Sequence, residues 1–108
     1  MVVLDGDPHK KGPFTLRLQF PANYRIMPHW HSMAENISVI EGELHMGTGP
    51  KVDESKDRAL PAGSFAVMPM KFEHYAYTTD KQTIVQLHGT GPFDITYIDP
   101  KDDPRKKK

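Results

Sequence analysis

Residues 29–35 read His29-Trp30-His31-Ser32-Met33-Ala34-Glu35, and His74 follows in a separate segment. On an extended strand, residues i and i+2 project from the same face, so His29 and His31 are predicted to aim at one point. Glu35 opens the next extended run and brings a carboxylate to the same place. With His74 arriving from a distant hairpin, four metal-ligating side chains would meet inside a closed sheet. The stretch therefore predicts a β-barrel built around a metal ion.

The rest of the chain is patterned as short strands separated by turns. Phe14, Leu16, Leu18 and Phe20 alternate with polar residues, which is typical of a strand with one buried face. Further extended runs are predicted at residues 24–27, 35–40, 43–46, 64–68, 74–78, 81–88 and 93–98. The run 43–46 is predicted to pair back on 35–40 as a hairpin, and 47–58 to form a polar surface loop. About eight to ten short strands without a long helix predict an all-β sandwich or barrel.

Composition narrows the class of protein. The chain has 108 residues, no cysteine, and 14 basic against 14 acidic residues. Its length predicts one domain over 1–108, with a core over 14–98 and flexible ends at 1–12 and 100–108. The balanced charge gives no basic surface for nucleic acid, and residues 105–108 are interpreted as a solvated tail. Without cysteine there is no disulfide, zinc ribbon or thiol nucleophile.

Targeting segments are not visible in the sequence. No apolar run approaches the length of a transmembrane helix, and Met1–Asp5 lacks the basic start and apolar stretch of a signal peptide. We therefore expect no membrane partner and a cytoplasmic location for the chain as given. Secretion stays open for a chain whose leader was removed.

The two histidine-bearing segments resemble the motifs of the cupin superfamily, whose members are small jelly-roll β-barrels. The first motif runs His-x-His, three residues, Glu, six residues and Gly. Its positions are held here by His29, His31, Glu35 and Gly42. The second motif runs Gly, five residues, Pro, x, Gly, two residues and His. Its outer positions are held here by Gly63, Pro69 and His74. The resemblance covers most of residues 14–98, and the chain is similar to small single-domain bacterial cupins. This resemblance implies a metal-binding double-stranded β-helix, but it does not identify a substrate.

Two positions depart from the cupin pattern. Lys71 stands where the second motif usually has glycine. If that turn needs a positive φ, a lysine there costs on the order of 1 kcal/mol. Thr78 stands where many members carry asparagine. Neither change removes a ligand, so the prediction of a metal site is unaffected.

The predicted metal ligands are His29, His31, Glu35 and His74. Three imidazoles and one carboxylate suit iron, manganese, cobalt, nickel, copper or zinc in the divalent state. A tetrahedral zinc with four protein ligands would be closed and structural, whereas an octahedral ion keeps two positions open. We therefore favour iron or manganese as the cofactor, with nickel, zinc, cobalt or copper as alternatives.

Other side chains near the motifs are candidates for a substrate pocket: Gln86, His88, Met33 and Phe72. Gln86 and His88 share one face of a predicted strand and suit the outer partners that ligating histidines need. The alternative for both is a solvent-facing surface. The other two candidates suit an adaptable apolar wall. Trp30, Tyr75 and Tyr77 have the opposite strand parity to the ligands and are predicted to pack in a core or a subunit interface.

The function hypotheses differ in what the metal does. An ion with open positions in a small, partly apolar pocket predicts an oxidoreductase of dioxygenase type acting on a small organic substrate. In it, Glu35 would be a ligand and, once detached, a catalytic base. A lyase or isomerase acting on a sugar-derived substrate is the second hypothesis, and a non-catalytic sensor module that binds metal or a small ligand is the third. The edge strands of so small a barrel predict a homodimer.

Overall fold

The computed structural model describes residues 1–104. Within that range the regular structure consists of ten strands and one short 3₁₀ helix, η1. The strands are β1 (Val2–Asp5), β2 (Gly12–Phe20), β3 (Arg25–Trp30), β4 (Glu35–Glu41), β5 (Glu43–Thr48), β6 (Arg58–Pro61), β7 (Phe65–Met68), β8 (His74–Tyr77), β9 (Thr83–Gly91) and β10 (Thr96–Tyr97). The helix η1 spans Pro100–Asp102. None of the described residues forms a helix with the length and apolar character that crossing a bilayer requires.

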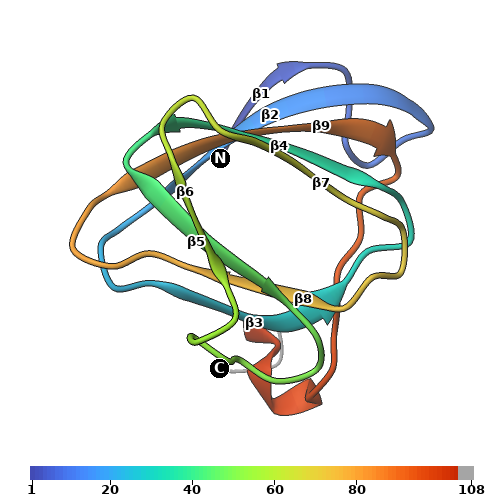
Figure 1. Cartoon of the computed structure of the whole chain (residues 1–108). Coiled ribbons are helices and arrows are strands. Elements are labelled where there is room, and N and C mark those ends of the chain that lie inside the picture. The colour runs from blue at the N-terminus through green and yellow to red at the C-terminus, as the bar shows by residue number, and fades with distance from the viewer. Residues whose placement is uncertain (105–108) are drawn as a thin grey trace.

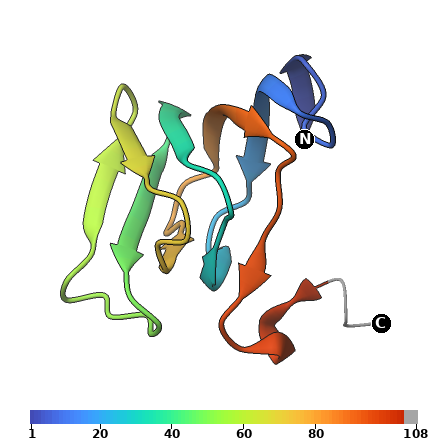
Figure 2. The ribbon, with the colours of Figure 1, turned by 90° about the vertical axis from the view of Figure 1, so that its right-hand side faces the viewer.

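Two antiparallel sheets face each other across the interior of the molecule (Figure 1). One sheet has the strand order β1-β2-β9-β4-β7, and the other has the order β10-β3-β8-β5-β6. Strands that neighbour one another in a sheet are mostly distant in sequence, so the chain repeatedly crosses from sheet to sheet, as in a jelly roll. The side view shows β10 next to β3, near the C-terminal end of the described chain (Figure 2). The predicted all-β jelly-roll barrel is confirmed.

The core lies between the two sheets and is built by strand alternation. On β2 the predicted pattern holds, because Phe14 and Leu16 are at most 2% exposed while Arg17 is exposed. Val39 of β4 and Val85 of β9, each 2% exposed, meet the same interior. Strands β2, β4 and β9 therefore each give one face to a shared apolar core.

Strands β4 and β5 do not form the predicted hairpin. β4 pairs with β7 and β9, whereas β5 pairs with β6 and β8, so the two strands belong to different sheets. Gly42 joins them with a φ of 81°, and a Cβ at this position would overlap the backbone oxygen of Gln82. The turn thus moves the chain from one sheet to the other at a point of close backbone approach, where only glycine fits.

The sequence did not predict the strands β1 and β6 or the helix η1. β1 pairs with β2 inside the segment 1–12 for which a flexible end is expected, and its side chains are exposed. β6 pairs with β5 at the end of the predicted surface loop. At the other end, the Asp99 side chain accepts a hydrogen bond from the Lys101 N–H and caps η1. The predicted tail at 105–108 lies outside the described residues.

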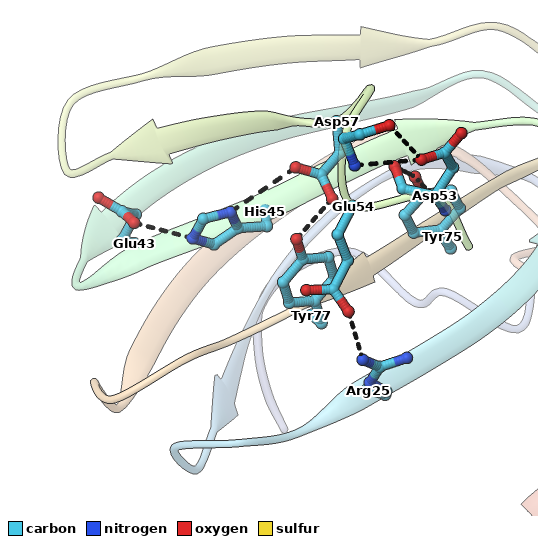
Figure 3. Close-up of polar contacts among 9 residues, drawn as sticks. Arg25, Glu43, His45, Asp53, Glu54, Asp57, Tyr75 and Tyr77 are labelled. Carbon is cyan, nitrogen blue, oxygen red and sulfur yellow. Dashed lines mark hydrogen bonds and ion pairs between the residues drawn. The ribbon is translucent and has the colours of Figure 1, made fainter.

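The loop 49–57 covers the outer face of β8. Tyr75 and Tyr77 point away from the barrel interior and are buried beneath this loop (Figure 3). The Tyr75 hydroxyl accepts a hydrogen bond from the Asp53 N–H and donates one to the Asp53 carbonyl, at 3.0 and 2.8 Å. The Tyr77 hydroxyl donates to the Asp57 carboxylate. These bonds fix the loop to the barrel, so both tyrosines have the packing role that their parity predicts.

Candidate metal centre

Strand β3 delivers His29 to the barrel interior through an irregularity in its pairing. Ile26 and His29 both pair with residues of β8, but the register shifts between them, where Pro28 has no N–H to donate. Such a bulge turns side chains to a different face. As a result Ile26 and His29 both line the interior although they are three positions apart. His31 follows just beyond the end of β3 and is 3% exposed.

The other two predicted ligands come from separate strands. Glu35 begins β4 and His74 begins β8, and both are buried. The ligating nitrogens of His29, His31 and His74 lie within 4.8 Å of one another. The Glu35 carboxylate oxygens lie 3.4 Å from Nε2 of His31 and 3.4 Å from Nε2 of His74. The structure therefore brings together all four residues that the motif spacing selects.

Backbone carbonyls fix the orientation of all three imidazoles. Nδ1 of His29 is 2.7 Å from the Met27 carbonyl, and Nδ1 of His74 is 2.9 Å from the Phe72 carbonyl. Nδ1 of His31 is hydrogen-bonded to the Asp94 carbonyl in the same way. A carbonyl oxygen only accepts, so each neutral ring carries its proton on Nδ1 and leaves the Nε2 lone pair free. This tautomer is the one that allows a histidine to bind a metal through Nε2.

Two of the ring nitrogens are buried without a hydrogen bond. Among the described residues, Nε2 of His31 and Nε2 of His74 have no hydrogen-bond partner. Their 3.4 Å separations from Glu35 are ion-pair distances, longer than a good N–H···O bond. Buried polar atoms are nearly always satisfied. Free imidazole lone pairs beside a carboxylate form a donor set that divalent transition metals bind, so these residues fit a metal ion.

The electrostatics favour the ligating state of two of these groups. Burial, together with the neighbouring His74 ring, lowers the pKa of His29 to about 4, so that this imidazole is neutral at pH 7. Burial opposes ionisation of Glu35, but His31 and His74 outweigh it and lower the pKa of the carboxyl to about 2. Burial also opposes protonation of His31, yet the Glu35 carboxylate raises the pKa of this imidazole above its ordinary value. A metal ion would therefore compete with a proton at His31.

Asp94 contacts His31 and Ser32, and the sequence did not reveal these contacts. Its carbonyl orients His31, and its carboxylate accepts hydrogen bonds from the N–H and the hydroxyl of Ser32. The ring of Phe93 packs on the His31 ring with centroids 5.0 Å apart. The segment before β10 thus holds the second ligand from outside. A backbone carbonyl carries no sequence signal, and Asp94 lies 63 residues from His31, so no local pattern identifies the contact.

The turn that leads to His74 has the backbone conformation anticipated from the glycine position of the motif. Lys71 has a φ of 60°, in the left-handed region that disfavours residues with a Cβ. Its N–H donates a 2.7 Å hydrogen bond to the His31 carbonyl, which ties the turn to the ligand segment. The second departure, Thr78, is buried and donates its hydroxyl to the Pro21 carbonyl at 2.6 Å. Both substitutions leave the ligand positions intact.

The four candidate pocket residues do not line the cavity beside the histidines. Gln86 is on the outer face of β9, where its side-chain oxygen accepts a 2.9 Å hydrogen bond from Arg17. His88 is exposed on that same face. Met33 lines a surface groove, and Phe72, 50% exposed, lines another that includes Trp30. A substrate-binding role for these four residues therefore stays a prediction. On β9 the inward positions belong to Val85 and Leu87, and the sequence left the choice of face open.

Comparison with known families decides the relationship. The sequence matches the ChrR cupin-like domain over residues 2–94, which is most of the chain. The chain belongs to this family. No curated protein matches the sequence. The predicted cupin relationship is therefore confirmed.

Solved structures share the fold of this cupin-like domain at low sequence identity. A cupin-2 domain protein from Shewanella frigidimarina is 17% identical, with a TM-score of 0.65 over 82% of this chain and 78% of its own. The polyketide cyclase RemF from Streptomyces resistomycificus is 18% identical, with a TM-score of 0.70 over 85% and 64%. Recombinant oxalate oxidase in complex with glycolate is 23% identical, with a TM-score of 0.65 over 81% and 46%. These likenesses show the fold, and the chain spans less than two thirds of the last two proteins.

Proposed function

We propose that this cupin-like domain is a metal-dependent oxidoreductase of dioxygenase type that acts on a small organic molecule. The observation that carries the proposal is the pair of buried Nε2 atoms, on His31 and His74, that face the Glu35 carboxylate without a hydrogen-bond partner. Iron or manganese is the favoured ion, because a reaction with dioxygen needs a redox-active metal and zinc has no redox chemistry.

His29, His31, His74 and Glu35 would hold the ion, which when bound supplies open positions that orient substrate and dioxygen. A dioxygenase places both oxygen atoms in the organic product, so the reaction needs no external reductant. The carbonyls that accept from Nδ1 keep the three rings in the ligating tautomer before the ion arrives. The buried setting of the cluster excludes water and so strengthens the electrostatic interactions within it.

Glu35 is proposed to act as ligand and as base. With its pKa near 2, the carboxylate is ionised in the resting protein, which suits ligation. The same carboxylate is almost fully buried, and burial is the largest influence on its pKa. Once it moves away from His31 and His74, burial raises the pKa towards the range in which a carboxylate accepts a proton from an enol.

Oxygen consumption by iron-loaded protein tests this proposal. We expect oxygen-dependent loss of a substrate from a panel of diketones, flavonols and related enols, with label from ¹⁸O₂ entering the product. His74→Ala should abolish the reaction. His88→Ala, a change at an exposed histidine outside the barrel, should leave it intact. Loss of substrate at an equal rate under argon would contradict the proposal.

We also propose that two copies of the domain associate through β1. This strand lies at the edge of its sheet, and Val2, Val3 and Leu4 are all between 44% and 60% exposed. An exposed apolar edge strand is a template for pairing with another chain. Light scattering should give a dimer for the wild type and a monomer for Val3→Lys. A monomeric wild-type protein would refute this assembly.

A further inference from the structure

A small cavity lies inside the barrel, directly against the ligand cluster. Its volume is about 40 Å³, and one part of its wall is formed by His29, Glu35 and His74. The remaining wall comes from both sheets and is wholly apolar. Leu44 of β5, Ala76 of β8 and Val85 of β9 are buried members of this wall. The cavity therefore lies on the side of the ligands that faces the core.

The chemistry of this wall restricts what it accepts. Apart from the ligands, no residue lining the cavity carries a hydroxyl, an amide or a charge. An organic carboxylate, phosphate or sugar hydroxyl placed there would lose its hydration without gaining a partner, which costs roughly 2–7 kcal/mol per polar group and far more for a charge. An uncharged molecule with little polarity loses almost nothing on entry.

The volume of the cavity limits the size of the molecule that it can hold. One water molecule needs a cavity of about 10–15 Å³, so 40 Å³ accommodates about three non-hydrogen atoms. A diketone or a flavonol does not fit beside the ligands unless the barrel opens. Leu18, Phe20 and Ile26 are partly exposed and form the outer part of the same wall. A larger organic molecule is therefore not expected to occupy this cavity.

We propose that this cavity is a binding site for an uncharged, weakly polar molecule of about two to four non-hydrogen atoms. Dioxygen is the member of that class that the reaction needs, an identification that rests on the proposed function. The site for the small molecule itself is formed by Leu44, Ala76 and Val85 and does not depend on metal. In this arrangement, the core side of the ligand cluster holds the gas and excludes polar competitors.

Xenon tests the site in metal-free protein, because it is apolar and occupies small dry cavities. Crystals of metal-free protein held under xenon pressure should show an anomalous peak between Leu44, Ala76 and Val85. Ala76→Val places two methyl groups in the space and should remove the peak. Ala59→Val, the same change at an exposed position on β6, should leave it unchanged. If Ala76→Val does not fold, Val85→Ile serves the same purpose.

Several results would overturn the proposal. These are an absent peak in the wild type, an undiminished peak in the filled variant, or formate displacing xenon from the cavity. Metal binding is measured separately by titration calorimetry. Metal binding without xenon would refute the cavity site and leave the proposed function standing. Xenon binding in a protein that takes no metal would support the cavity and refute the proposed function.

Discussion

Replacing Lys71 by glycine is expected to stabilise the protein. The φ of 60° at Lys71 places a residue with a Cβ in the left-handed region, at a cost of about 1–2 kcal/mol. Glycine removes that cost but adds about 0.5–1 kcal/mol of backbone entropy in the unfolded chain. The net gain in the free energy of unfolding is therefore about 0.5–1 kcal/mol. For a domain of this size that raises Tm by roughly 2–4 °C.

Two controls isolate the backbone effect in thermal and urea unfolding. Lys71→Ala removes the same charged side chain but keeps the Cβ, so it should not share the gain. Asn23→Gly changes the other non-glycine residue with positive φ in residues 1–104, at 57°. Asparagine tolerates this conformation, so the change there should be small. Equal stability of Lys71→Gly and Lys71→Ala would refute the reasoning. Metal affinity should not change, because the N–H at position 71 still donates to the His31 carbonyl.

Three further changes test the site and its support. In urea titrations of the wild type, metal at one hundred times Kd should raise the free energy of unfolding by about 2.7 kcal/mol. Glu35→Gln should bind the metal at least tenfold more weakly, so the same metal concentration should raise its free energy of unfolding by about 1.4 kcal/mol or less. In metal-free protein, the pKa of His29 is about 4 in the folded state and near 6.5 in the unfolded state. As the pH drops, the unfolded chain therefore takes up the proton first. The free energy of unfolding should fall by about 3 kcal/mol between pH 6.5 and pH 4. His29→Gln should flatten that fall in urea midpoints, and an unchanged slope would count against a buried neutral ring. Gly47→Ala should cost about 1–3 kcal/mol, because the new methyl group would overlap the Tyr75 ring; a neutral result by calorimetry would mean that the loop 49–57 is not held as described.

Motif spacing predicted that the three histidines and Glu35 lie together, because the spacing reflects strand geometry. His29, His31 and Glu35 are close in sequence, and His74 carries its own turn signal, so their convergence follows from a two-sheet fold. The parity of Tyr75 and Tyr77 relative to His74 was informative for the same reason, because both tyrosines are buried on the outer face of β8. The sequence also located the strained turn at Lys71, whose φ is 60°.

The remaining features depend on contacts that are distant in sequence. Glu41-Gly42 has the appearance of a hairpin turn, but whether it joins strands of one sheet or of two is decided by which strands β4 and β5 pair with elsewhere. On β9, apolar residues occupy both faces, because Ile84 is outside and Val85 inside, so the sequence did not settle where Gln86 points. The carbonyl of Asp94 acts through the backbone and has no residue-type signal.

The metal content of the protein tests the central claim most directly. Protein purified without added metal, then equilibrated with iron or manganese under argon and desalted, should hold a single divalent ion per chain by elemental analysis. His74→Ala should hold none, while His88→Ala should match the wild type. A wild-type protein that retains no metal, or a His74→Ala variant that retains as much, would contradict a site formed by the three imidazoles and Glu35.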